Sequence, residues 1–339
     1  MIKKFRKSVQ EGTGWVFILS IAVLAVMSVL SLCIGAKKIP FTEVANAIFH
    51  YNPENKNHMI LRTLRLPRTL TAAAVGGSLA VSGSLMQAVT RNPMASPSVL
   101  GINAGAGLGL ALAMVLYPTA SFHATVLFSF AGAGAAAGII FFLAAVTPAG
   151  KTPAGLALAG MAITALFQGV SQSLAVFFQI SQELTFWNAG GIAGVRTEQV
   201  FMLLPWTGAG MLLAVFLSGQ VSLLSFGEET AGGLGGKVRW LRWGAMAAVL
   251  VLTGSSVAIA GPIGFVGLVV PHGIRFLVGA DYRRVIPGSI LGGALLVTAA
   301  DLVARMVNPP FETPTGAVTA LIGVPFFMWL ASGKGGDRG

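Results

Sequence analysis

Charged residues are scarce in this sequence: Asp, Glu, Lys and Arg make up 10% of its 339 positions. A soluble domain carries about 25% charged residues, so this chain lacks the side chains needed to cover a water-facing surface. Hydrophobic residues make up 55% of the sequence, and the mean hydropathy is +0.79. These values exclude a soluble protein and indicate an integral membrane protein.

Cysteine and histidine are also scarce. The one cysteine, Cys33, excludes an internal disulfide and a cysteine metal cluster. The four histidines include no pair with the helical spacing of metal ligands. No serine, cysteine or carboxylate arrangement points to catalysis, so the sequence predicts no catalytic residue, no metal site and no cofactor.

A phosphate-binding loop is absent as well. Residues 149–152 (Ala-Gly-Lys-Thr) resemble the end of such a loop, but Ala145 stands where its first glycine is needed. Any energy from ATP must therefore come from a partner. The net charge of +11 would suggest nucleic acid in a soluble protein. In a membrane protein, basic residues fix the topology and contact anionic headgroups, so we expect membrane lipid and no nucleic acid as a partner.

Long apolar segments fill most of the chain. A membrane-spanning helix needs about 20 apolar residues, and the 44 glycines favour close packing of such helices. The sequence predicts an all-α integral membrane protein, a single domain over residues 1–339 with ten tightly packed transmembrane helices. The expected spans are 15–36, 67–89, 99–116, 124–146, 153–180, 200–217, two within 243–280, 285–307 and 316–331.

Two segments depart from the pattern of regular spans and short loops. The segment 243–280 is short for two crossings and is broken at Gly261-Pro262, so one of its helices is expected to be short or broken. Residues 37–66 are polar and are expected to form a loop on the membrane surface, which includes the amphipathic segment 41–49.

An even number of spans places both termini on one side of the membrane. Most of the 22 Lys and Arg residues then lie on that side, which the positive-inside rule assigns to the cytoplasm. Six basic residues on the opposite side share one loop, and topology does not explain them, so another use is expected. These six are Lys37, Lys38, Lys56, Arg62, Arg65 and Arg68.

Residues 226–242 form a charged island between two apolar runs, 199–227 and 243–274, that carry no charge. A polar segment in such a setting lies outside the bilayer, and we expect it on the cytoplasmic side. Asp301 and Arg305 stand four residues apart in the ninth span, which favours a mutual ion pair. A proton or ion relay, or an Arg305 that extends outward to the membrane surface, remains open as an alternative.

Five segments carry a resemblance to a known family, in order and at the family's spacing: 64–69 (LRLPRT), 91–97 (RNPMASP), 227–235 (GEETAGGLG), 261–272 (GPIGFVGLVVPH) and 312–327 (ETPTGAVTALIGVPFF). From about residue 60 to its C-terminus, the sequence resembles the permease family of iron-siderophore and cobalamin ABC importers, the FecCD-type permeases.

The resemblance implies a multi-pass permease of the bacterial cytoplasmic membrane with both termini cytoplasmic. Two permease subunits pair, as a homodimer or a heterodimer, around a central pathway. Two ABC ATPase subunits dock on the cytoplasmic face, and an extracellular or periplasmic substrate-binding protein delivers the ligand. The expected cargo is an Fe(III)-siderophore complex, with cobalamin or haem as further candidates.

The resemblance also assigns roles to individual residues. The ATPase-coupling residues would be Gly227, Glu228, Glu229, Ala231, Leu234 and Gly235. The cytoplasmic gate would be formed by Asn92, Met94, Pro153 and Ala154, although the last two differ from the small hydroxyl residues of some relatives. Three arginines would face glutamates of the binding protein on the outer side: Arg65, Arg68 and Arg305.

Two other classes of function compete with an ABC importer subunit. A secondary transporter driven by an ion gradient would need more intramembrane ionisable groups than Asp301 and Arg305. A membrane-embedded enzyme would need a catalytic cluster, and the sequence suggests none.

Overall fold

The computed structural model describes residues 2–35, 37–147, 153–225, 238–309 and 311–332, and within these ranges the regular structure is helical throughout. The helices are α1 (Ile2–Cys33), α2 (Phe41–Phe49), α3 (Lys56–Ile60), α4 (Leu66–Thr90), α5 (Ile102–Leu116), α6 (Phe122–Val146), α7 (Pro153–Phe177), α8 (Ser181–Asn188), α9 (Thr197–Ser225), α11 (Val238–Ala260), α12 (Val266–Val278), α13 (Tyr282–Val307) and α14 (Thr315–Ala331). A π-helical turn (Leu61–Arg65) joins α3 to α4, and a 3-10 turn (Pro97–Leu100) precedes α5.

Within the described residues, seven helices are long and apolar enough to cross a membrane: α1, α4 with the helical segment before it, α6, α7, α9, α11 and α13. Three apolar helices are shorter: α5, α12 and α14. The predicted all-α membrane fold is confirmed, whereas the count of ten crossings stays a prediction. The expectation of one short helix around Gly261-Pro262 is also confirmed, because α11 has 23 residues and α12 has 13.

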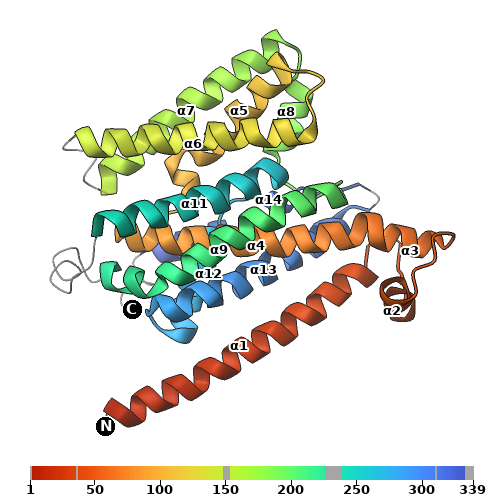
Figure 1. The fold of residues 1–339 in the computed structure, drawn as a ribbon, viewed down its shortest axis with the longest axis horizontal. Coiled ribbons are helices and arrows are strands. Elements are labelled where there is room, and N and C mark those ends of the chain that lie inside the picture. The colour runs from red at the N-terminus through yellow and green to blue at the C-terminus, as the bar shows by residue number, and fades with distance from the viewer. Residues whose placement is uncertain (1, 36, 148–152, 226–237, 310, 333–339) are drawn as a thin grey trace.

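The helices are arranged in layers around α4, which lies at the centre of the bundle in Figure 1. Helices α9, α11, α12 and α13 pack directly against α4. Helices α5 to α8 form a separate layer on the far side of α11, and α1 packs along α13 on the opposite side. We call the end of the molecule that carries α2 and α3 the outer end, and the end where α1 begins the inner end (Figure 1).

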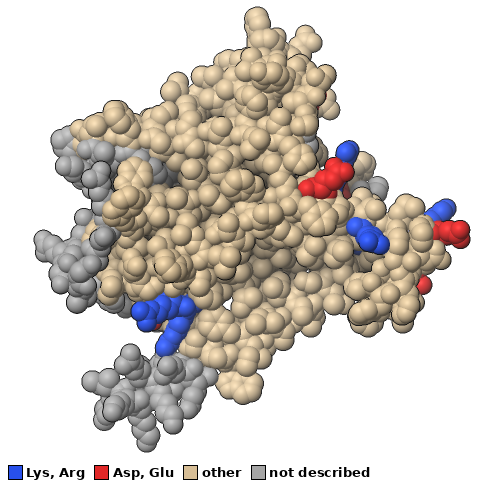
Figure 2. Space-filling model, in the orientation of Figure 1, with Lys and Arg blue, Asp and Glu red and all other residues tan. Residues whose placement is uncertain are grey.

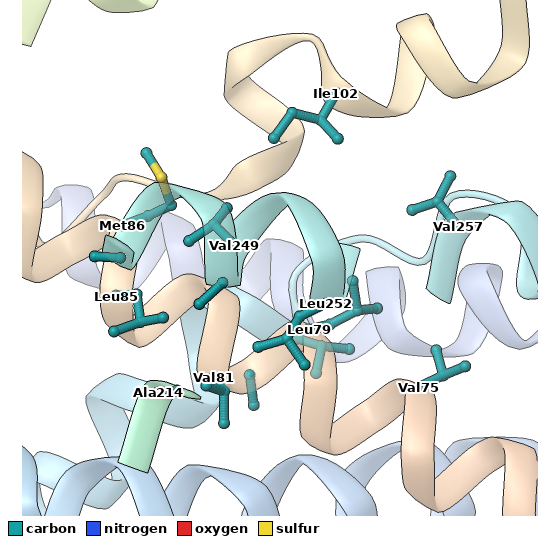
Figure 3. Close-up of a cluster of buried hydrophobic side chains, with 14 of the residues drawn as sticks. Val75, Leu79, Val81, Leu85, Met86, Ile102, Ala214, Val249, Leu252 and Val257 are labelled. Atoms are coloured by element: carbon teal, nitrogen blue, oxygen red, sulfur yellow. The ribbon is translucent and has the colours of Figure 1, made fainter. Parts of the chain in front are cut away.

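Close packing of α4 depends on glycine. A Cβ atom at Gly76 would lie 2.1 Å from the carbonyl oxygen of Gly293 in α13, and one at Gly83 would lie 1.8 Å from that of Gly267 in α12. Lipid supplies no hydrophobic force between helices, so backbones that approach this closely gain their stability from dispersion contacts. The side chains that fill the remaining space are mostly aliphatic, and Figure 3 shows those of α4 and α11 together with Met86, with Ala214 of α9 and Ile102 of α5 nearby.

The surface has the charge distribution of a membrane protein. On the face shown in Figure 2, the charged side chains that the structure describes lie near the two ends, and a broad band between them carries none. Such a band matches the apolar interior of a bilayer, and the charged ends match the headgroup regions.

The outer loop differs in part from its prediction. The amphipathic segment is helix α2, as expected, but residues 56–65 are helical and continue into α4 instead of forming a loop. The side chain of Asn55 caps this helix by accepting a hydrogen bond from the backbone N–H of Asn57 at 2.9 Å. Leu61 then packs with Leu32, Ile39 and Val44, so burial of apolar side chains stabilises the extension.

Candidate functional site

Four charged side chains meet at the outer end, and we call them the outer charge cluster: Arg68 from α4, Asp301 and Arg305 from α13, and Glu312 from the α13–α14 linker. The Nε of Arg68 lies 2.9 Å and 3.1 Å from the two carboxylate oxygens of Asp301. The Nη2 of Arg305 lies 2.8 Å from the same carboxylate. Asp301 is completely buried, so the two guanidinium groups supply the compensation that a buried charge requires.

Glu312 forms the exposed edge of this cluster. The Nη1 of Arg68 lies 2.6 Å and 2.8 Å from the two carboxylate oxygens of Glu312. The Glu312 side chain is 46% exposed, in contrast to 9% for the Arg68 side chain. With two arginines and two carboxylates, the cluster is neutral overall, and Glu312 is the member that solvent or a partner reaches first.

Hydroxyl and backbone groups complete the cluster and connect it to α1 and α14. Arg305 donates to the backbone oxygen of Ser31 at 3.1 Å and also to its side-chain oxygen, and that oxygen lies 2.7 Å from the hydroxyl of Thr69. The hydroxyl of Thr315 at the start of α14 lies 3.4 Å from Asp301 Oδ1. The cluster therefore ties four helices together at the outer end.

Arg65 has a separate role at the end of α1. Its guanidinium group donates to the backbone oxygens of Leu32 and Lys37, and its side chain is buried. The last carbonyls of a helix have no intrahelical partner. Arg65 thus satisfies one such carbonyl of α1 and holds the chain that follows it.

These contacts decide several of the sequence-based expectations. The ion pair between Asp301 and Arg305 is confirmed. The alternative of an outward-extended Arg305 is wrong, because this residue is only 8% exposed. The expectation that Arg65, Arg68 and Arg305 stand outward on the surface is also wrong, since each is buried and donates to groups of its own chain. Pairing across 233 residues, as between Arg68 and Asp301, has no local signal in the sequence. The docking role of these arginines stays a prediction.

The predicted gate residues lie in the turn after α4 and at the start of α7. Arg91 ends α4 in the left-handed conformation (φ 49°), and the side-chain oxygen of Asn92 then accepts from the backbone N–H of Met94 at 2.9 Å. Such an Asx turn fixes the chain direction after the helix. Pro153 and Ala154 are the first two residues of α7. A gating role for these four residues stays a prediction.

The predicted coupling residues lie outside the described residues: Gly227, Glu228, Glu229, Ala231, Leu234 and Gly235. The helix that leads to them is anchored at the inner end. Ser222 near the end of α9 donates to Asp281 at 2.9 Å and accepts from the backbone N–H of Tyr282 at 2.8 Å. Asp281 also caps α13 through the N–H of Arg283 at 3.0 Å. The end of α9 is therefore fixed beside the basic turn at the start of α13.

Two cavities flank α8, and the sequence interpretation included neither. A cavity of about 620 Å³ lies between α5, α8, the end of α11 and residues 312–315, so Glu312 lines it. A second cavity, of about 420 Å³, lies between α5, α7 and α8 and is lined by several uncharged polar side chains. Its signal in the sequence is the spacing of Thr164, Gln168, Ser171 and Gln172, which fall on one helical face.

Comparison with known proteins gives consistent matches over nearly the full chain. A model of the FecCD transport family matches residues 23–332. The iron(3+)-hydroxamate import system permease protein FhuB of Bacillus subtilis is 46% identical over 320 residues, which cover 94% of this chain and 83% of that protein. The iron-uptake system permease protein FeuB of Bacillus subtilis is 40% identical over 329 residues, covering 97% of this chain and 98% of that protein.

A solved structure has the same fold. It is an inward-facing conformation of an ABC transporter assigned to the metal-chelate type, with a TM-score of 0.82 and 28% sequence identity. The match covers 94% of this chain and 99% of that chain. Fold, sequence and family comparison therefore agree over nearly the whole chain.

Proposed function

The chain belongs to the FecCD transport family and is a membrane permease of an ABC importer, and we propose that its cargo is an Fe(III)-siderophore complex. The single observation that supports this cargo best is the 46% identity to the hydroxamate permease FhuB over 94% of the chain. Cobalamin and haem are the remaining candidates. A multi-pass permease of this family lies in the cytoplasmic membrane, and we propose that both termini face the cytoplasm.

The outer charge cluster argues against an ion-gradient mechanism. Both oxygens of Asp301 are occupied by guanidinium groups, from Arg68 and Arg305. A carboxylate that carries a proton or an ion along a pathway must exchange its partner during transport, whereas Asp301 is completely buried and paired with two arginines of its own chain. The cluster is better explained as a fixed joint between helices, with the energy for transport supplied elsewhere.

We propose that this energy comes from two ABC ATPase subunits that dock on residues 226–242, and that a second permease subunit, identical or paralogous, completes the pathway. The anchor between Ser222 and Asp281 supports this proposal, because it fixes the end of α9, the described helix that precedes this segment, beside the basic turn that follows α12. A force applied to the island by an ATPase would reach α9 and α13 directly through this anchor.

The outer end is the proposed docking surface for a substrate-binding protein. Arg68 is already held by an exposed carboxylate, Glu312, so a carboxylate of the binding protein would replace Glu312 on Arg68 when it docks. Arginine suits such an exchange because its guanidinium group can donate hydrogen bonds to carboxylates in several arrangements. Arg65 and Arg305 would hold the surrounding helix ends in place during the exchange.

Uptake of radiolabelled iron tests the proposed function. Cells that lack this chain, but keep the binding protein and ATPase encoded with it, should import a ferric hydroxamate only when the chain is restored. A protonophore applied while cellular ATP is maintained should leave this uptake intact. Uptake that follows the proton gradient and survives loss of the ATPase would contradict the proposal, and uptake of cobalamin or haem alone would change the cargo.

The position of the island can be tested separately. In a Cys33→Ala background, Thr230→Cys should react with a membrane-impermeant thiol reagent only after the cells are opened. Ala231→Arg should abolish ATPase docking while the permease still inserts and pairs, because it adds bulk and charge at a predicted contact. Labelling of intact cells, or normal transport by the arginine variant, would exclude the coupling role.

A further inference from the structure

Helix α7 has a face of uncharged polar residues in a chain that is poor in charged ones. Thr164, Gln168, Ser171 and Gln172 follow the spacing i, i+4, i+7 and i+8, which places them on one side of the helix. Elsewhere on the helix, several large apolar side chains of α7 are exposed, among them Leu158, Leu166 and Val176. Polar residues in a membrane helix face protein or water in preference to lipid, so this face of α7 has a use.

The polar face opens into the cavity of about 420 Å³ between α5, α7 and α8. The cavity gains further polar groups from Ser98 before α5, Asn103 in α5 and Asn188 at the end of α8. None of its lining residues carries a charge. Four primary amides and three hydroxyl groups therefore surround one space that has the volume of a small-molecule site.

One of these amides has an acceptor without a partner. The Nδ2 of Asn103 donates to the hydroxyl of Ser98 at 3.2 Å, while its Oδ1 is buried and accepts no hydrogen bond from the residues that the structure describes. A buried acceptor without a partner is costly, so a rotation that turned this amide toward the cavity would let its oxygen accept from a bound group. Gln168, Gln172 and Asn188 are exposed, so their amides are free to reorient toward such a group.

We infer that this cavity binds the uncharged, hydrogen-bonding surface of the chelate during its passage, and that it selects neutral chelates such as ferric trihydroxamates over anionic ones such as ferric citrate. The inference rests on the proposed function and names the class of substrate within it. Amides offer donors and acceptors together, which matches the carbonyl and amide groups on the outside of a hydroxamate chelate. An anionic chelate would lose its hydration here without meeting a positive charge, which is unfavourable in a low-dielectric site.

The interactions are also suited to transport. Hydrogen bonds between neutral groups contribute modestly because they replace bonds to water. A site built from them orients a passing molecule without retaining it, whereas a charged site would bind an oppositely charged chelate for longer.

The main test removes the amides from the polar face. In proteoliposomes that contain the complete transporter, Gln168→Leu combined with Gln172→Leu should lower the uptake of a neutral ferric trihydroxamate by about tenfold, the effect expected for two lost hydrogen bonds. ATP hydrolysis stimulated by the binding protein should stay at the wild-type level, because both substitutions lie outside the proposed coupling segment 226–242. Gln220→Leu, at an exposed glutamine of α9 that lines neither cavity, is the matched control and should leave uptake unchanged.

A second variant separates charge selection from folding. Gln168→Glu keeps the size of the side chain and adds a negative charge, so it should lower the uptake of ferric citrate more than that of the neutral chelate. Wild-type uptake by the double leucine variant, or equal effects of Gln168→Glu on both chelates, would overturn the inference. Loss of permease pairing in the leucine variant would also overturn it and would identify the polar face as a subunit contact. If the wild-type transporter imports no ferric chelate at all, the proposed function fails instead.

Discussion

Helices α4 and α7 have similar lengths and opposite surroundings. In their most apolar windows, 89% of the residues of the segment that contains α4 are buried, against 22% for α7. α4 is enclosed by α9, α11, α12 and α13, whereas α7 packs mainly against α5 and leaves much of its surface open. We infer that packing around α4 holds the fold together. The exposed surface of α7 is available for contacts outside the chain.

The same residue types serve different purposes in the two helices. Gly83 of α4 meets the backbone of α12 directly, whereas a Cβ added at Gly169 of α7 would have no neighbouring atom within 4 Å. Gln87 of α4 is buried and donates to the oxygen of Gly267 at 3.2 Å, whereas Gln168 of α7 lines a cavity. Glycine and glutamine therefore stabilise helix packing in α4, and in α7 they are free for other roles.

The largest loss of stability is expected from a substitution of Asp301, which joins α13 to the central helix α4. Asp301→Ala leaves the guanidinium groups of Arg68 and Arg305 buried without their shared carboxylate, and breaking a buried pair costs about 3–5 kcal/mol. We expect a large loss of thermal stability in detergent, measured as the fraction that stays monodisperse after heating. Glu183→Ala in the exposed helix α8 is the control and should have little effect. Equal stability of the two variants would show that the cluster does not hold the α4 block together.

A smaller loss of stability is expected when a glycine of α4 is replaced by alanine. In Gly83→Ala, the new Cβ would overlap the carbonyl oxygen of Gly267, and the helices must separate to accommodate it. Overpacking of this kind costs about 1–3 kcal/mol. The matched substitution Gly169→Ala in α7 meets open space and should leave the protein equally or slightly more stable, by up to about 1 kcal/mol. The comparison between α4 and α7 fails if both variants lose the same stability.

Much of the fold was predictable from local patterns. Apolar runs located the long membrane helices of the described residues, because each of these runs is about the length that a bilayer requires. The short helix α12 followed from the break at Gly261-Pro262, and the helix α2 followed from its amphipathic spacing. The pair of Asp301 and Arg305 followed from positions one helical turn apart. All these features depend on residues that are near one another in the sequence.

The sequence analysis missed contacts between residues that are distant in the chain. It also missed features that the overall polarity of a segment conceals. The contacts of Arg68 with Asp301 and Glu312 join residues 233 and 244 positions apart, and the sequence alone gives no sign of them. The spacing of the four polar residues in α7 indicates a polar face. The mean hydropathy of the whole apolar span conceals them. The helical extension at 56–65 was hidden because its polar residues suggested a loop, although Asn55 is a typical cap.

Glutamine provides a third test, with a smaller effect on stability. Gln87→Leu removes a buried hydrogen bond to the backbone oxygen of Gly267, and a loss of about 0.5–1.5 kcal/mol is expected. Gln168→Leu should leave thermal stability unchanged, since its amide lines a cavity and the structure shows it exposed. Thermal unfolding of both variants in the same detergent measures the difference. A stability loss at Gln168 as large as that at Gln87 would mean that α7 belongs to the packed block.

The smallest effect on stability is expected at Glu312, where the packed block meets the outer solution. Glu312→Gln keeps the shape of the side chain but removes its charge, and a half-exposed ion pair contributes only about 0–1 kcal/mol. Arg68 keeps its buried contact with Asp301, so the joint between α4 and α13 should persist. Thermal stability should therefore change far less than in Asp301→Ala.

Association with the binding protein should respond more strongly than stability does. In the wild type, an incoming carboxylate must displace Glu312 from Arg68, whereas a neutral glutamine competes less well for that guanidinium group. Glu312→Gln should thus strengthen association at low salt, and the gain should shrink as salt screens the new contact. Glu183 is another exposed carboxylate, and it lines the cavity of about 620 Å³ that Glu312 also lines. Glu183→Gln is therefore the control and should change neither thermal stability nor association with the binding protein. Weaker association in Glu312→Gln would mean that Glu312 itself contacts the binding protein, and no change at either salt concentration would show that Arg68 serves only to join α4 to α13.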